Sequence, residues 1–357
     1  MGFWKNQLTG PTDPATDAAW DTGKPRKGFF TDTSICIGCK ACEVACKEWN
    51  AVPEDGLGLL GSSYDNTGAL GASTWRHVAF VEQDGDRIAT ARESGRRLVD
   101  LGMPALRATA EAAGGSSDGS GVTDLRGATP TERTAVGQRE STGQPFQDGG
   151  SAGVAVAEAE IPDFRWLMSS DVCKHCTHAA CLDVCPTGAL FRTEFGTVVV
   201  QDDVCNGCGY CVAACPFGVI ERRPGEDTVK NAGIAQKCTL CYDRIGHDQT
   251  PACAQACPTT SIKFGDLAQM QDAARERVDV LHDLGYPEAR LYGANENDGV
   301  GGTGSVFLLL DEPEVYGLPP DPRVTTAALP DMFRKAGFAA VAMLGLAAAS
   351  FVGGRRR

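Results

Sequence analysis

Positive charge is scarce in this sequence of 357 residues. Asp and Glu number 46 against 33 Lys and Arg, and the formal net charge is −13. Because nucleic-acid phosphates demand a basic face, this balance argues against a nucleic-acid partner. The N-terminal twenty residues also lack a basic segment followed by an apolar run, and they hold no twin arginine. We therefore expect nothing in them to target the chain on its own.

The sequence motifs of several enzyme classes are missing as well. We find no Gly-rich phosphate loop beside a strand, no Ser/His/Asp arrangement with a nucleophile elbow, and no zinc-protease helix. We therefore expect the chain to have no catalytic site of its own.

Aromatic residues are almost missing from residues 86–160, which are rich in Gly, Ala, Ser and Thr. Such a stretch buries too little apolar surface to offset the entropy lost on ordering. We predict that 86–160 is a low-complexity insertion, draped over the surface or partly mobile. An alternative is that it clasps a partner subunit.

Long uncharged runs are rare, and the longest is Ala336–Gly354, with Arg334 and Lys335 before it and Arg355–Arg357 after it. As a helix, nineteen residues span roughly 28 Å, close to the hydrocarbon thickness of a bilayer. The run predicts one transmembrane helix at 336–354; the alternative is a buried core helix. The arginines after the run mildly favour a cytoplasmic C-terminus, which would put the rest of the chain on the extracytoplasmic side of the cell membrane.

Cysteine, in contrast, is present sixteen times, and every one falls into a group of four. The fraction, about 4.5%, is half of that expected for a small disulfide scaffold, so disulfides are not favoured. The first and third groups have the spacing Cys-x-x-Cys-x-x-Cys-x-x-x-Cys, and the third ends in Cys-Pro, which is typical of bacterial 4Fe-4S ferredoxins. The second and fourth groups widen one interval and keep the closing Cys-x-x-x-Cys-Pro. The four groups are Cys36, Cys39, Cys42 and Cys46; Cys173, Cys176, Cys181 and Cys185; Cys205, Cys208, Cys211 and Cys215; and Cys238, Cys241, Cys253 and Cys257.

This spacing has a chemical reason. Three thiolates two residues apart hold three irons of a cubane, while the fourth reaches another cluster in two-cluster ferredoxins. Zinc is the main alternative, but a tetrahedral zinc site joins two Cys-x-x-Cys pairs and has no use for a third cysteine two residues on. Four clusters without a substrate motif indicate an electron-transfer protein; a scaffold with structural clusters is the non-redox alternative.

Several residues next to the cysteines have less certain roles. His175 and His178 lie inside the second group, and because four cysteines already satisfy each cluster we place them outside the ligand sets. Lysines beside ligands can raise cluster potentials electrostatically, although solvated lysines are an equal alternative. These lysines are Lys40, Lys47, Lys174 and Lys237.

The segments between the cysteines predict short, mixed elements. Residues 189–200 read as two β runs around a Phe-Gly turn, 217–223 as another strand, 272–284 as an amphipathic helix, and 304–312 as a buried strand. The predicted fold class is α+β, with ferredoxin-like units.

The stretches CIGCKACEVACKEWN, RWLMSSDVCKHCTHAACLDVCPTGAL, CNGCGYCVAACPFGVI and KCTLCYDRIGHDQTPACAQACPTTSIKFG resemble the iron–sulfur (β) subunit of respiratory formate dehydrogenases. The later stretches LGYPEARLYG and VGGTGSVFLLLDEPEVYGLPPDP, before a single membrane helix, also look like this subunit rather than its nitrate or dimethyl sulfoxide reductase relatives. The resemblance covers about residues 31–84 and 163–351.

The resemblance implies two bacterial-ferredoxin-like domains, each holding two 4Fe-4S clusters. The first combines residues 1–85 with 230–330, and the second is 161–229, with the insertion at 86–160 and the transmembrane helix at 336–354. Each fourth cysteine then crosses to the partner group. The implied ligand sets are Cys36, Cys39, Cys42 and Cys257 (cluster one); Cys46, Cys238, Cys241 and Cys253 (cluster two); Cys185, Cys205, Cys208 and Cys211 (cluster three); and Cys173, Cys176, Cys181 and Cys215 (cluster four).

The same resemblance implies a molybdenum- or tungsten-pterin catalytic subunit that oxidises formate, a membrane cytochrome b that passes electrons to quinone, and contact with membrane lipid through the C-terminal helix. It suggests that the Cys36 cluster faces the catalytic subunit and the Cys173 cluster faces the membrane. The alternative is an electron-transfer subunit of another pterin enzyme, such as a sulfur-compound or arsenate reductase, with current in the other direction.

Overall fold

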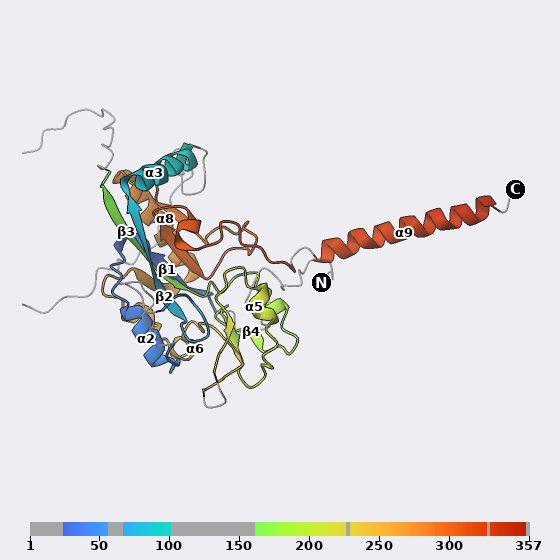
Figure 1. The fold of residues 1–357 in the computed structure, drawn as a ribbon, viewed down its shortest axis with the longest axis horizontal. Helices are drawn as coiled ribbons and strands as arrows, with labels where there is room; N and C mark the ends of the chain where they lie inside the picture. Colours follow the sequence, from blue (N-terminus) through green and yellow to red (C-terminus); the bar gives the residue numbers. More distant parts are fainter. Residues whose placement is uncertain (1–23, 56–66, 101–160, 226–228, 327–328, 355–357) are drawn as a thin grey trace, which may run out of the picture. The chain divides into compact units, whose positions relative to one another are not determined.

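The computed structural model describes residues 24–55, 67–100, 161–225, 229–326 and 329–354. These residues form an α+β structure in which helices and strands, many of them short, are interspersed along the chain (Figure 1). All four cysteine groups belong to one compact unit.

A four-stranded mixed sheet lies at the centre, in the order β8-β1-β10-β9. Strands β1 (Lys27–Asp32) and β10 (Ser305–Leu309) run parallel, while β8 (Ile262–Asp266) and β9 (Arg290–Tyr292) flank them antiparallel. All five residues of β10 are buried. The predicted buried strand at 304–312 is confirmed, because a strand covered on both faces needs the continuous apolar run that this segment provides.

Helix α8 (Leu267–Asp283) packs against β1, β8, β9 and β10. Its buried residues Ala274, Val278 and Leu281 follow the helical repeat, which confirms the amphipathic helix predicted at 272–284 and extends it toward the N-terminus. Val280, an apolar residue of the same helix, is exposed.

Strands β2 (Arg76–Asp84) and β3 (Phe164–Val172) form an antiparallel ribbon. Helix α3 (Gly85–Asp100) follows β2 directly, and its residues Ile88 and Ala91 are buried. The beginning of the predicted insertion is therefore a packed helix. Ile88 and Ala91 give it an apolar face, which the average composition of residues 86–160 did not indicate. Residues 101–160 of that prediction lie outside the described residues.

The cysteines lie in loops and on short elements around the sheet and the ribbon. Residues 189–200 form the predicted hairpin of β4 and β5, whereas only two residues of 217–223 are in strand β6. The remaining elements are η1 (Thr33–Ile35), α2 (Ala41–Trp49), α4 (Ala180–Asp183), β4 (Leu190–Arg192), β5 (Val198–Val200), α5 (Tyr210–Ala214), β6 (Glu221–Arg222), β7 (Ala235–Gln236), α6 (Tyr242–Ile245), α7 (Ala252–Gln255), η2 (Pro313–Tyr316) and α9 (Leu329–Gly354).

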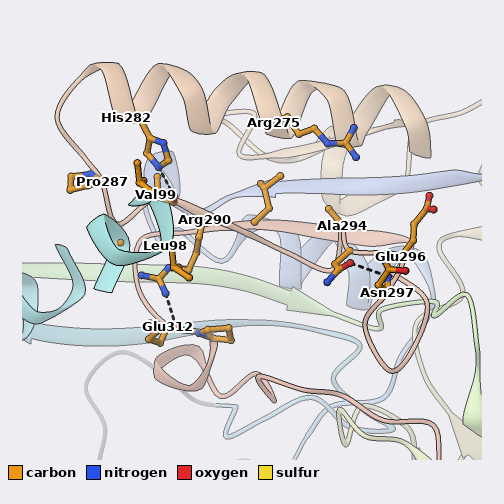
Figure 2. Close-up of a pocket in the computed structure, with 15 residues that line it drawn as sticks. Leu98, Val99, Arg275, His282, Pro287, Arg290, Ala294, Glu296, Asn297 and Glu312 are labelled. Carbon is orange, nitrogen blue, oxygen red and sulfur yellow. Dashed lines mark hydrogen bonds and ion pairs between the residues drawn. The ribbon is translucent and has the colours of Figure 1, made fainter. Parts of the chain in front are cut away.

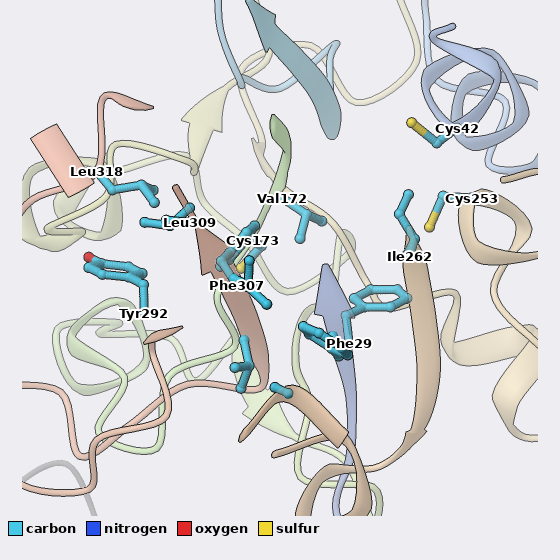
Figure 3. Close-up of a cluster of buried hydrophobic side chains, with 14 of the residues drawn as sticks. Phe29, Cys42, Val172, Cys173, Cys253, Ile262, Tyr292, Phe307, Leu309 and Leu318 are labelled. Carbon is cyan, nitrogen blue, oxygen red and sulfur yellow. The ribbon is translucent and has the colours of Figure 1, made fainter. Parts of the chain in front are cut away.

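The hydrophobic core includes several of the cysteines. Figure 3 shows Cys173 beside Val172 and Phe307, and Cys42 and Cys253 near Ile262. Placing thiols inside an apolar core keeps water from them, which matters for their chemistry below.

Helix α9 contains one stretch, Asp331–Ser350, that is long and apolar enough to cross a membrane by length and composition. None of that stretch is buried within the described part of the chain. The basic residues Arg334 and Lys335 pair with Asp331 at the beginning of the helix.

Candidate metal centres

In the first and third cysteine groups, the turns that carry the cysteines contain residues with left-handed backbone conformation. Gly38 (φ +64°) and Gly207 (φ +69°) occupy the same place in their Cys-x-Gly-Cys turns, and Lys40 (φ +58°) and Gly209 (φ +80°) then begin α2 and α5. A side chain at Gly207 would put its Cβ 2.4 Å from the Gly233 carbonyl oxygen. The turns therefore need glycine both for conformation and for space.

The thiols meet crosswise, between cysteine groups rather than within them. All sixteen cysteines lie in the described residues, and none is in a disulfide. One pocket is lined by the first three cysteines of the first group together with the last of the fourth: Cys36, Cys39, Cys42 and Cys257, hereafter the Cys36 set. Another is lined by three cysteines of the second group and the last of the third: Cys173, Cys176, Cys181 and Cys215, the Cys173 set.

Electrostatic coupling identifies two further groupings. Burial raises the pKa of Cys46 well above its usual value, and the nearby thiols of Cys238, Cys253 and Cys241 raise it further. These four cysteines are called the Cys46 set. Burial likewise raises the pKa of Cys211 to about 11, followed by the effects of Cys205, Cys208 and Cys185. These last four residues form the Cys205 set.

The donor chemistry fits a cationic iron–sulfur core. Burial is the first cause of the raised pKa of the Cys181 thiol, which reaches about 12. A buried thiol of this kind becomes a thiolate when a metal coordinates it, because the metal charge replaces the lost hydration. Four thiolates at a tetrahedral zinc would lie about 3.8 Å apart. Among the described residues, no three His, Cys, Asp or Glu side chains gather closely enough to hold a single metal ion.

The four sets are linked to one another. The thiol of Cys42, in the Cys36 set, has its pKa raised by burial and also by Cys253 of the Cys46 set. After burial, the largest effect that raises the pKa of Cys238, also of the Cys46 set, comes from Cys173. The Cys46 set therefore lies between the Cys36 set and the Cys173 set.

The third link joins Cys181 of the Cys173 set to Cys211 of the Cys205 set. The Cys173 set thus has neighbours on both sides, and the Cys205 set comes last. This order differs from the expectation that the Cys173 set faces the membrane. Cys39 in the first set and Cys208 in the last are the two exposed cysteines.

Two lysines beside the thiols are buried, so the alternative that they are solvated is wrong for them. Lys174 donates to Asp171 and to the Val172 carbonyl, and its ammonium lies 5.0 Å from the centre of the Phe307 ring. Lys237 donates to the carbonyls of Val198 and Cys238. Lys40 and Lys47 are half-buried.

His175 and His178 are both buried. His175 lines the pocket of the Cys173 set, where its Nδ1 accepts from the Val198 amide at 3.1 Å. Burial, and then Lys237, lower the pKa of His175 well below its usual value. Because Nδ1 accepts the hydrogen bond from the Val198 amide, the Nδ1 atom carries no proton and the ring proton lies on Nε2.

Three polar residues that the sequence reasoning missed contact thiols or lie beside them. Ser170 Oγ lies 3.2 Å from Cys42 Sγ, and Arg76 Nη1 donates to Ser170 Oγ at 3.0 Å. Asn50 Nδ2 lies 3.7 Å from Cys46 Sγ. Only Asn50 could have been found from the sequence, because it follows Cys46 by one helical turn. Ser170 and Arg76 lie on the ribbon of β2 and β3, whose pairing was not predicted.

A separate cavity of about 420 Å³ has no cysteine in its lining. Figure 2 shows Leu98 at the end of α3, His282 on α8, and Arg290, whose Nη1 pairs with Glu312 Oε2 at 2.6 Å. This cavity is not part of the thiol sites.

Crosswise thiols within an α+β frame define a ferredoxin-type iron–sulfur protein. Residues 164–267 match the 4Fe-4S dicluster domain. The chain is 33% identical over 325 residues to the formate dehydrogenase iron-sulfur subunit of Haemophilus influenzae, covering 89% of this chain and 76% of that protein. It is 31% identical over 300 residues to the nitrate-inducible formate dehydrogenase iron-sulfur subunit of Escherichia coli K12, covering 83% and 73%.

A shorter match also exists. The thiosulfate reductase electron transfer subunit PhsB of Salmonella typhi is 47% identical over 116 residues, which are 32% of this chain and 56% of that protein. The formate dehydrogenase subunits match over most of both chains, so the chain belongs to the family of formate dehydrogenase iron–sulfur subunits. It is an electron-transfer subunit that binds 4Fe-4S clusters and has no catalytic site of its own.

Proposed function

We propose that this chain carries electrons through four 4Fe-4S clusters, from a formate-oxidising molybdenum- or tungsten-pterin subunit toward a membrane cytochrome b and quinone. The observation that carries the proposal is that thiols from different cysteine groups line the same pockets. The relatives that match this chain over most of its length are formate dehydrogenase iron–sulfur subunits. When bound, each cluster takes up and gives up one electron.

The proposed ligands are the four sets defined above. Clusters one and two use the Cys36 and Cys46 sets, cluster three the Cys205 set, and cluster four the Cys173 set. The pockets support clusters one and four, and the mutual effects on thiol pKa support clusters two and three. The chain itself supplies the thiolates, excludes water from those that are buried, and fixes the spacing of neighbouring sites.

The proposed domains are 1–85 with 230–330, and 161–229. Packing of α2 against α7, and pairing of β1 with β8, support the first, since each contact joins residues that are distant in sequence. Packing of α4 against α5 supports the second.

We place the four clusters in the order one, two, four, three. The couplings Cys42 to Cys253, Cys238 to Cys173, and Cys181 to Cys211 support this order. Each cluster then has its nearest neighbours along a single path.

The exposed ends of this path are the proposed contact surfaces for partners. Ile37 and Val44 are exposed near Cys39, and Val204 and Tyr210 are exposed near Cys208. Exposed apolar side chains beside an accessible ligand suit a protein partner that must approach a cluster closely. We assign the Cys39 end to the catalytic subunit and the Cys208 end to the cytochrome.

We propose that residues 336–354 anchor the subunit in the membrane lipid. The length and composition of α9 support this. The arginines at 355–357 support a cytoplasmic C-terminus, with the cluster-bearing part on the extracytoplasmic side.

A second candidate function is electron transfer for another pterin enzyme. The similarity to the Salmonella typhi thiosulfate reductase subunit favours it, although that match covers about a third of this chain. The two candidates share the clusters and differ in the substrate of the partner.

The test uses a tagged chain purified anaerobically, with its partners, from detergent-solubilised membranes. Formate is added and the clusters are followed by low-temperature EPR, with dithionite as the control reductant. Reduced 4Fe-4S signals with formate support the proposal. If dithionite reduces the clusters while formate does not, although a competent catalytic partner is present, the second candidate replaces it.

A further inference from the structure

Arg76, the first residue of β2, is 1% exposed and carries a positive charge into the interior. Its Nε and Nη2 atoms have no hydrogen-bond partner in the described part of the chain. A buried guanidinium without compensation is costly, so its surroundings must supply negative charge.

Thiolates supply this charge once clusters are bound, because a coordinating thiol is deprotonated. Arg76 faces four such thiols, those of Cys253, Cys42, Cys238 and Cys46, and its hydrogen bond to Ser170, which contacts Cys42 Sγ, fixes its place beside them. Three of these cysteines belong to the Cys46 set, and Cys42 belongs to the Cys36 set. Arg76 is therefore a cation shared by two neighbouring sites.

The remaining contacts hold Arg76 in this place. Its Nη1 donates to Ser170 Oγ at 3.0 Å and to the Ser170 carbonyl at 3.2 Å. The guanidinium carbon lies 4.8 Å from the centre of the Phe29 ring. Pairing of Arg76 with Val172 across the ribbon fixes the register that brings Ser170 within reach.

Ser170 extends the effect to Cys42. A guanidinium can only donate hydrogen bonds, so Ser170 Oγ accepts from Arg76 and its own proton is free for another partner. Cys42 Sγ lies 3.2 Å away and has no proton when it binds a cluster as a thiolate, so Ser170 then donates to it. A donor polarised by a cation thus points to a ligand of the Cys36 set.

We propose that Arg76 raises the reduction potentials of clusters one and two together, directly by its charge and, for cluster one, also through Ser170. The proposal rests on the ligand sets of the proposed function. A reduced cluster carries one more negative charge, which a fixed buried cation stabilises, and hydrogen bonds to the sulfurs act in the same direction.

The test is a redox titration of the purified complex with chemical mediators and dithionite, followed by EPR. The main variant is Arg76→Met, which keeps the length of the side chain and removes its charge. We expect two of the four midpoint potentials to fall, each by at least the 59 mV that corresponds to a tenfold change in a one-electron equilibrium. Ser170→Ala should lower only one of those same two, by a smaller amount, and Arg76→Lys should leave both near the wild type.

Arg92→Met is the matched control. Arg92 is equally buried, but its Nε lies 3.6 Å from the carboxylate of Glu288 rather than among thiols. We expect this variant to shift none of the four potentials. If the loss of a buried arginine acted only by destabilising the fold, the midpoint potentials would shift in both Arg76→Met and Arg92→Met.

Unchanged potentials in Arg76→Met with full iron content would overturn the proposal, as would an equal shift of all four. If Arg76→Met fails to retain iron, Ser170→Ala decides alone, and an unchanged set of potentials in that variant overturns the proposal. Because the titration uses no formate, failure of formate to reduce the wild-type clusters would reject the proposed function without deciding the role of Arg76.

Discussion

The side-chain amide of Asn50 lies 3.7 Å from the sulfur of Cys46, which precedes it by one turn at the end of α2. The same nitrogen is 3.9 Å from the sulfur of Cys241. One amide therefore serves two ligands from different cysteine groups, and it also donates to the Cys46 carbonyl at 2.8 Å.

Replacing Asn50 with Leu should lower the reduction potential of cluster two. The change removes a donor to sulfur, and a hydrogen bond worth about 0.5–1 kcal/mol corresponds to roughly 20–40 mV for one electron. An EPR-monitored titration measures the change. Gln271→Leu, which removes a half-buried amide from a pocket lined by no cysteine, serves as the matched control. A potential that stays the same or rises in the Asn50 variant would contradict the expectation.

Removing Glu288 should destabilise the subunit strongly. This residue is fully buried, and its Oε1 lies 2.7 Å from Arg165 Nη1 and 3.6 Å from Arg92 Nε. Glu288→Ala leaves the buried Arg92 and the half-buried Arg165 without this carboxylate, at a cost of about 3–5 kcal/mol. A lower midpoint of thermal unfolding at constant iron content measures it. Glu312→Gln, at a partly exposed ion pair with Arg290, should cost less than about 1 kcal/mol, and equal effects would contradict this account.

The Glu312 pair also gives a dependence on pH. Burial acts to raise the pKa of Glu312, but hydrogen bonds from Ser94 and Arg290 outweigh it, so the folded pKa is lower than the usual 4.5. The stabilisation is therefore present above about pH 4.5 and is lost as the pH falls through the folded pKa. The difference in unfolding midpoint between the wild type and Glu312→Gln should shrink as the pH is lowered below 4.5. A difference that grows on acidification would have the wrong sign.

Deleting residues 331–357 should release the cluster-bearing part of the chain from membrane lipid. The deletion removes the only apolar helix of sufficient length in the described residues. Carbonate-washed membranes, probed for the tagged chain expressed without the cytochrome partner, provide the measurement. A chain shortened only by residues 355–357 is the control and should remain in the membrane fraction. Retention of the longer deletion there would mean that another contact anchors the chain.

The sequence predicted those features that depend on local pattern. Two such features are the spacing of Cys36, Cys39 and Cys42 and the helical repeat of α8. Both depend on residues close together in the sequence, and the structure contains the corresponding turn and helix. The crosswise role of Cys257 came from family resemblance, because it depends on the packing of α2 against α7.

What could not be predicted depends on contacts between distant segments. Arg76 reaches the thiols only because β2 pairs with β3, and the sequence of β2 gives no sign of that register. Lys174 looked as exposed as any lysine, although two aromatic rings and Asp171 enclose it. The neighbours of each set could not be predicted for the same reason, since only the fold brings Cys173 beside Cys238.

The central claim is that each fourth cysteine belongs to a site built by another group. It is tested most directly by counting intact 4Fe-4S clusters with Mössbauer spectroscopy in paired variants of the purified complex. Cys257→Ala alone should leave about three of the subunit's four clusters. Adding Cys36→Ala should leave the same three, because both residues serve cluster one, whereas adding Cys253→Ala should leave about two. The reverse result, with the Cys253 pair at three and the Cys36 pair at two, would contradict the account.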